Sequence, residues 1–121
     1  MNKKISSVLL LAILFVSSCQ SGNKHSGEFK DAQTLIDKTV AEHPEIVRLT
    51  IHAVPSGQTE SRIIACNIRE KLGKLDDPED LEVVKTKKAI ALKEDNNLDV
   101  TAPILDKAGN AIAATGITLR G

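Results

Sequence analysis

The chain has 121 residues with 16 basic and 16 acidic side chains, so its formal net charge is zero. This balance excludes the strongly basic surface that nucleic-acid binding normally needs. Aromatic residues make up 2% of the chain, two Phe without Trp or Tyr, so the sequence offers no stacking platform for bases or sugars. We expect one folded domain from a chain of this length.

The N-terminal residues have the three parts of a secretory signal. Lys3 and Lys4 form the charged end, residues 5–16 form a mostly apolar run, and small residues follow. A transmembrane helix needs about 20 apolar residues, so this run is too short to span a bilayer. We expect residues 1–18 to be removed, which leaves 103 residues with 14 basic and 16 acidic side chains, a net charge of −2.

The segment Val16-Ser17-Ser18-Cys19 resembles a bacterial lipobox. The resemblance implies diacylglycerol on the Cys19 sulfur, cleavage before this residue, and usually acylation of the new amino group. Two or more acyl chains hold a protein stably on a membrane where one chain does not. We therefore expect a lipoprotein of the bacterial cell envelope, anchored to the inner or outer membrane, with its domain facing the periplasm or the cell exterior. The alternative is an ordinary secreted protein.

After lipidation, Cys66 is the one remaining thiol, so no intramolecular disulfide can form. It lies in the apolar run 63–68, which predicts a buried and inert thiol rather than a reactive one. Residues 20–27 contain two Gly and no large apolar side chain, a composition typical of a flexible tether. With the lipidated Cys19, these residues would connect the membrane to one α+β domain over residues 28–121.

The domain is expected to begin with an amphipathic helix over residues 28–43, because apolar residues recur there at steps of three and four and Pro44 stops the pattern. Residues 46–54 and 61–68 are rich in β-branched side chains and predict a hairpin. Asp77 as N-cap and Pro78 predict a second helix over about 78–86. Three further strands are expected at residues 88–93, 98–105 and 111–119.

Short connections between these elements favour one antiparallel sheet of about five strands, covered by helices on one face. Within the first strand, Val47, Leu49, Ile51 and Ala53 alternate with Arg48, Thr50 and His52. This alternation predicts a buried aliphatic side and a wetter polar side.

The same order of elements, with the closing segment 99–112 and its Pro103-Ile104-Leu105-Asp106, resembles the extracytoplasmic sensory domains called Cache, which are PAS-like. The resemblance implies a long N-terminal helix leading into a five-stranded antiparallel sheet. It also implies binding of small carboxylates or amino acids through Arg, Tyr, Trp and Asp, although Tyr and Trp are missing here. Such domains usually continue into a transmembrane helix and a signalling module, whereas this chain ends at Gly121, so we expect a partner protein.

The chemistry-bearing residues form no catalytic or metal motif. His25, His43 and His52 have no metal-ligand spacing, and no Cys pair or carboxylate completes a zinc set. The acidic run 76–82 lacks the pattern of an EF-hand and is explained by helix capping. No Ser lies in a Gly-x-Ser-x-Gly elbow. We therefore expect no catalytic residue, no metal and no cofactor, and a protein that is not an enzyme.

Small side chains at positions 111, 113, 114 and 116 either let a helix pack closely on the last strand or leave a hollow for a ligand. The polar residues predicted to line such a hollow are His52, Arg62, Asn67, Thr101 and Thr115. The first hypothesis is therefore a small-molecule binding or sensory module that acts through a partner. The second is a structural or protein-interaction lipoprotein without a ligand. An open cavity with converging polar groups would favour the first.

Overall fold

The structure is a computed structural model that describes residues 27–121. The chain divides into two units, Met1–Lys30 and Asp31–Gly121, and the second contains all of the sheet. The expected signal segment, Cys19 and residues 20–26 of the expected tether lie outside the described residues. No helix in the described part of the chain is long and apolar enough to cross a membrane.

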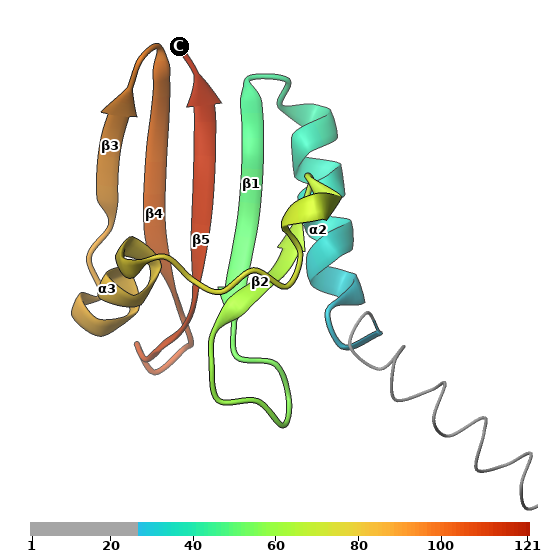
Figure 1. The fold of residues 1–121 in the computed structure, drawn as a ribbon, viewed down its shortest axis with the longest axis vertical. Helices are drawn as coiled ribbons and strands as arrows, with labels where there is room; N and C mark the ends of the chain where they lie inside the picture. Colours follow the sequence, from blue (N-terminus) through green and yellow to red (C-terminus); the bar gives the residue numbers. More distant parts are fainter. Residues whose placement is uncertain (1–26) are drawn as a thin grey trace, which may run out of the picture. The chain divides into compact units, whose positions relative to one another are not determined.

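Within residues 27–121 the fold is α+β, with two α-helices and one five-stranded antiparallel sheet (Figure 1). Its elements in chain order are α2 (Lys30–Glu42), β1 (Ile46–Ala53), β2 (Arg62–Cys66), the short 3₁₀ helix η1 (Arg69–Lys71), α3 (Pro78–Thr86), β3 (Ile90–Glu94), β4 (Asn97–Leu105) and β5 (Ala111–Arg120). The strand order is β2-β1-β5-β4-β3. The predicted α+β class and the five antiparallel strands are confirmed.

Helix α2 is joined to β2 through the side chain of Gln33. Its Oε1 accepts a hydrogen bond from the Cys66 amide, and its Nε2 donates to the Cys66 carbonyl, both at 3.0 Å. Arg69 also donates to this carbonyl and binds Asp37 of α2, each at 2.9 Å. The hydrogen bond from Arg69 holds the pKa of Asp37 below its ordinary value. Gln33 and Arg69 therefore supply the hydrogen bonds that a neighbouring strand would otherwise give to the backbone of Cys66 at the end of β2.

Helix α3 begins directly after Asp77, as predicted, and the Asp77 amide donates to Asp80 Oδ2 at 2.8 Å. The helix packs against β4 and β5, and its Val83 is fully buried. The segment before it, residues 72–77, runs across the sheet toward α3 (Figure 1). It is fixed to the edge of β2 by two backbone hydrogen bonds of 2.9 Å, from Ile63 N to Lys74 O and from Gly73 N to Ile63 O.

The side chains of β1 alternate as predicted, but the burial of the two faces is reversed. Thr50 and His52 are 4% and 5% exposed, whereas the four aliphatic residues of the opposite face, Val47, Leu49, Ile51 and Ala53, are only half-buried. The prediction of a buried aliphatic side and a wetter polar side is therefore wrong. The reason is that the segment 72–80 lies over the polar face and supplies hydrogen-bonding partners to His52.

Cys66 is buried at the end of β2, with no exposed surface, which confirms the prediction of a buried thiol. Its Sγ accepts a hydrogen bond from the Ile68 amide at 3.3 Å. The backbone of Cys66 is held by Gln33, so the thiol, the strand end and α2 form one packed junction.

Replacing Gln33 with Ala is expected to lower the free energy of unfolding, because the Cys66 amide loses its acceptor. Loss of such a partner costs about 1–3 kcal/mol, and each kcal/mol lowers the melting temperature of a domain of this size by roughly 4–8 °C. Thermal denaturation followed by circular dichroism measures the change. The matched control is Gln58→Ala, at an exposed side chain bonded to Arg62, which should change stability by less than about 0.5 kcal/mol. Equal losses in both variants would contradict the role of Gln33.

Candidate functional site

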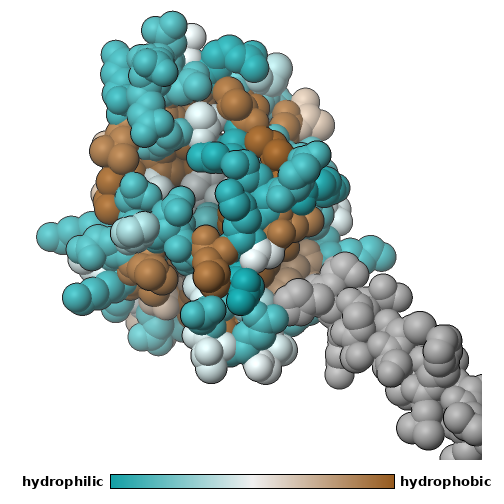
Figure 2. Space-filling model, viewed as in Figure 1, coloured by the Kyte–Doolittle hydropathy of each residue, from teal (hydrophilic) through white to brown (hydrophobic). Residues whose placement is uncertain are grey.

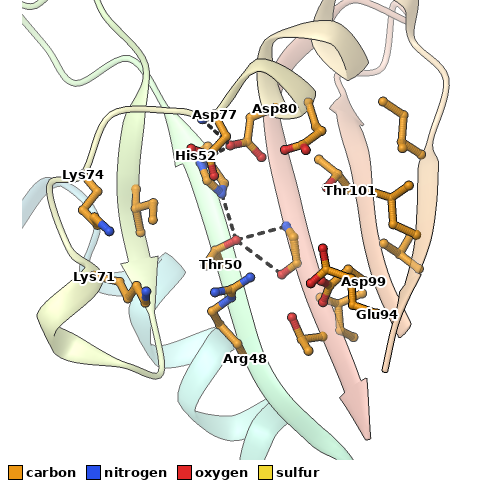
Figure 3. A pocket seen from close by; sticks show the side chains of 18 of the residues that line it. Arg48, Thr50, His52, Lys71, Lys74, Asp77, Asp80, Glu94, Asp99 and Thr101 are labelled. Atoms are coloured by element: carbon orange, nitrogen blue, oxygen red, sulfur yellow. Dashed lines mark hydrogen bonds and ion pairs between the residues drawn. The ribbon is translucent and has the colours of Figure 1, made fainter. Parts of the chain in front are cut away.

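The covered face of the sheet contains a cavity of about 270 Å³. Its floor comes from β1, β3, β4 and β5, and its rim comes from the segment between η1 and α3 (Figure 3). The polar lining residues are Arg48, Thr50, His52, Lys71, Lys74, Asp77, Glu79, Asp80, Glu94, Asp99, Thr101 and Thr118. On the side of the molecule drawn in Figure 2, hydrophilic and hydrophobic side chains are interspersed.

The register of the strands brings the polar floor together. Thr50 of β1 lies opposite Gly116 of β5, and Gly116 lies opposite Thr101 of β4. One step along, Arg48 lies opposite Thr118, which lies opposite Asp99. Directly paired residues of neighbouring strands share a face of the sheet, so these two rows all belong to the cavity face.

Unpartnered charges of both signs line the cavity. Lys71 and Lys74 lie on one side, Glu94 and Asp99 lie on the other, and Arg48 lies between them (Figure 3). Within residues 27–121, the Arg48 side chain makes no hydrogen bond or ion pair. Asp99 Oδ1 is buried and has no hydrogen-bond partner in the same part of the chain. The cavity therefore presents a free guanidinium and a free carboxylate oxygen.

A buried network centred on His52 borders the cavity. The ring Nδ1 lies 2.9 Å from Asp76 Oδ1 and 3.5 Å from Asp80 Oδ2, and Nε2 lies 2.9 Å from Thr50 Oγ1. Thr50 Oγ1 also accepts from the Gly116 amide at 3.1 Å and donates to the Gly116 carbonyl at 3.3 Å. Burial raises the pKa of the Asp80 carboxyl, against the hydrogen bond from the Asp77 amide and the charge of His52.

The order hydroxyl, imidazole, carboxylate in this network is also the order of a nucleophile, its base and the acid that orients the base. Here the hydroxyl of Thr50 is engaged by both the amide and the carbonyl of Gly116. The contact fixes β1 to β5 and leaves Thr50 without the freedom to attack a substrate. We assign no catalytic role to these residues.

Two of the five predicted lining residues, His52 and Thr101, line the cavity. Arg62 instead donates from Nε to Gln58 Oε1 at 2.9 Å and from Nη1 to the Gly73 carbonyl at 3.1 Å. It therefore fixes the hairpin turn and the segment beside β2, outside the cavity.

Asn67 and Thr115 also lie outside the cavity lining. The Asn67 side chain continues the pairing of β1, since its Oδ1 accepts from Leu49 N at 2.8 Å and its Nδ2 donates to Val47 O at 3.2 Å. Thr115 pairs with Ile51 on the opposite face of the sheet, and its hydroxyl donates to the Thr50 carbonyl at 2.8 Å. The prediction of one hollow lined by all five residues is not met.

The small residues of β5 differ in their relation to the cavity. Ala114 is 1% exposed and lies outside the cavity lining, whereas Gly116 lines the cavity. A Cβ at position 116 would lie 2.7 Å from Thr50 Oγ1 and 3.9 Å from His52 Nε2. Gly116 therefore permits the close approach of the Thr50 hydroxyl and keeps the cavity floor free of a side chain.

The site residues predicted from the sequence do not include Arg48, Thr50, Asp76, Asp80 or Asp99. A signal was present for Arg48 and Thr50, which alternate with aliphatic residues next to His52. The spacing of His and carboxylate residues along the sequence predicted no metal site. In the fold, ligand atoms of His52, Asp76 and Asp80 lie within 4.8 Å of one another.

Comparison with known proteins adds no further assignment. No protein-family model matches the chain, and no curated protein matches its sequence.

Replacing Gly116 with Ala is expected to destabilise the fold, because the new methyl group would press on the Thr50 hydroxyl. Overpacking of this kind costs about 1–3 kcal/mol. The cost should be smaller when Thr50 is already Ala. In a double-mutant cycle measured by chemical denaturation, the double variant should therefore lose less stability than the sum of the two single variants. Strictly additive effects would show that the two residues do not press on each other.

Proposed function

We propose that this domain binds a small zwitterionic molecule of the amino-acid class in the cavity on its sheet. The observation that carries the proposal is Asp99 Oδ1, a buried acceptor without a donor at the cavity wall. A buried polar atom left without a partner is costly. A ligand ammonium group would supply the missing donor and would compensate the carboxylate charge.

The opposite end of such a ligand is matched by Arg48, which lines the same cavity without a partner among the described residues. A guanidinium binds a carboxylate through two parallel hydrogen bonds. Lys71 and Lys74 add positive charge on the side away from Asp99 (Figure 3). The separation of cations from anions across one cavity therefore suits a molecule that carries both charges.

The size and the apolar lining of the cavity support a small ligand with an aliphatic part. Ligand pockets commonly enclose roughly 300–1,000 Å³, and this cavity is just smaller than that range, with about 270 Å³. Its apolar lining residues are aliphatic: Ile63, Leu75, Ile90, Leu92, Val100 and Ile117. No Phe, Tyr or Trp of residues 27–121 lines it, which disfavours nucleobases and sugars as ligands.

The wider proposal is a membrane-anchored lipoprotein whose domain is Cache-like or PAS-like and reports its ligand to a partner protein. Its supports are the Val16–Cys19 lipobox pattern and the antiparallel five-stranded sheet that the resemblance leads one to expect. The alternative, an interaction lipoprotein with a filled core, is disfavoured by the cavity and its unpartnered charges.

The ligand proposal predicts saturable binding of an amino acid to the full chain purified in detergent, measured by titration calorimetry across the common amino acids. Asp99→Asn should weaken binding by about 10- to 100-fold, since hydrogen bonds to charged groups contribute about 1.5–3 kcal/mol. The same change should leave the melting temperature of the free protein equal or higher, because it removes a buried unpaired charge. Glu60→Gln, in the exposed turn between β1 and β2, is the control and should bind normally. Absence of binding by every amino acid tested would refute the proposal.

The anchoring proposal predicts that Cys19→Ala releases the protein from membranes of an expressing bacterium. The reason is that the lipid chains supply the membrane affinity, which scales with the number of buried methylene groups. The distribution between membrane and soluble fractions after a carbonate wash measures the effect. Cys66→Ala is the matched control, because this thiol is buried, and that variant should remain with the membrane. Recovery of the Cys19→Ala variant in the membrane fraction after the wash would contradict the proposal.

A further inference from the structure

The three side chains that meet beside the cavity floor have the composition of a metal site. His52, Asp76 and Asp80 each offer a ligand atom, and these atoms lie within 4.8 Å of one another. We propose that they bind one divalent transition-metal ion of the zinc class through His52 Nδ1 and the two carboxylates. This site is separate from the proposed amino-acid site, because neither Arg48 nor Asp99 belongs to it.

The distances between the ligand atoms suit a small ion. His52 Nδ1 lies 2.9 Å from Asp76 Oδ1 and 3.5 Å from Asp80 Oδ2. Ligand atoms at zinc-to-nitrogen and zinc-to-oxygen bond lengths lie roughly 3.4 Å apart in a tetrahedral site. The three side chains therefore need only small shifts to accommodate such an ion.

The hydrogen bonds behind the ring direct the Nδ1 atom toward the carboxylates. Thr50 Oγ1 accepts from the Gly116 amide. When the Thr50 hydroxyl donates its proton to the Gly116 carbonyl, its remaining lone pair accepts from His52 Nε2–H. Nδ1 then points a lone pair at two groups that bring no donor of their own. In this tautomer, a proton or a metal ion between Nδ1 and the carboxylates supplies the positive charge that they lack. A ligating His typically donates its other ring N–H to a fixed acceptor in this way.

Two further observations favour a metal ion over a proton. Asp76 Oδ2 is buried and has no hydrogen-bond partner within residues 27–121, and the Asp76 side chain is 2% exposed. A single proton on Nδ1 leaves this oxygen unsatisfied, whereas an ion bound by both oxygens of Asp76 supplies its partner. A neutral imidazole, two carboxylates and a divalent ion also sum to zero charge, at a site whose side chains are all less than one-tenth exposed.

The ligand set and its surroundings indicate the class of ion. Imidazole with carboxylates suits zinc and its neighbours in the first transition row, whereas calcium and magnesium prefer oxygen ligands alone. His52 and Asp80 also line the cavity. An ion can therefore enter from the cavity and can keep one coordination position open toward it.

The test is calorimetric titration of ZnCl₂ into the chelator-treated full chain in detergent, with CaCl₂ and MgCl₂ as comparison ions. We expect one zinc ion per chain, bound at least 100-fold more tightly than calcium or magnesium. Asp76→Asn should weaken zinc binding at least tenfold. The matched control is His43→Gln, which removes an exposed His that lies 3.1 Å from Glu45, and this variant should bind zinc normally. Absence of zinc binding by the unmodified chain, or loss of binding in His43→Gln, would overturn the proposal.

A measurement on the unmodified chain covers the case in which Asp76→Asn does not fold. Nitrogen-15 resonances of the His side chains, recorded before and after one equivalent of zinc, should show a shift at His52 Nδ1 while His52 Nε2 remains protonated. A shift confined to the rings of His25 or His43 would overturn the proposal. The two proposals can fail independently. Binding of zinc but of no amino acid would support the metal site alone, and binding of an amino acid but not of zinc would support the amino-acid site alone.

Discussion

The imidazole of His52 holds the sheet and the segment that covers it together. Its Nε2 meets Thr50 in the centre of the sheet, and its Nδ1 meets Asp76 and Asp80 at the start of α3. Buried polar groups stabilise a fold only when their partners are in place. Removing the ring would leave two carboxylates buried with no positive partner, which costs more than the lost hydrogen bonds alone. The His52 ring therefore joins the start of α3, and with it the rim of the cavity, to the sheet.

The cavity follows from this attachment together with the absence of a side chain at Gly116. The segment leading into α3 is fixed to the sheet at His52, and Gly116 adds no side chain to the cavity floor. Arg48 and Asp99 lie one register step away and have no partner in the described part of the chain that would close the space between them. Unsatisfied charges reduce the stability of a free domain, and proteins retain such costs mainly where binding requires them.

The local elements of this fold could be read from the sequence, because each depends on residues close together in the chain. The start of α3 at Asp77-Pro78 and the positions of the five strands are of this kind. Alternation along β1 identified which residues share a face, but the covering segment decided which face is buried. The partner Asp76 lies 24 residues from His52, beyond any spacing rule. Thr115 was placed in the hollow because register was unknown, and a shift of one residue moves a side chain to the other face.

Because Cys66 is buried at the junction between α2 and β2, the reactivity of its thiol can report when this junction opens. A thiol reacts as the thiolate, and only when a reagent can reach it. The Cys66 thiol has no exposed surface, and its backbone is bonded to Gln33 of α2. Alkylation of this residue therefore has to wait until the end of β2 separates from the helix, and its rate reports the free energy of that local opening. With the other cysteine, Cys19, lipidated as proposed, the chain would contain one native probe of the event, so the dynamics of this junction could be followed without adding a label.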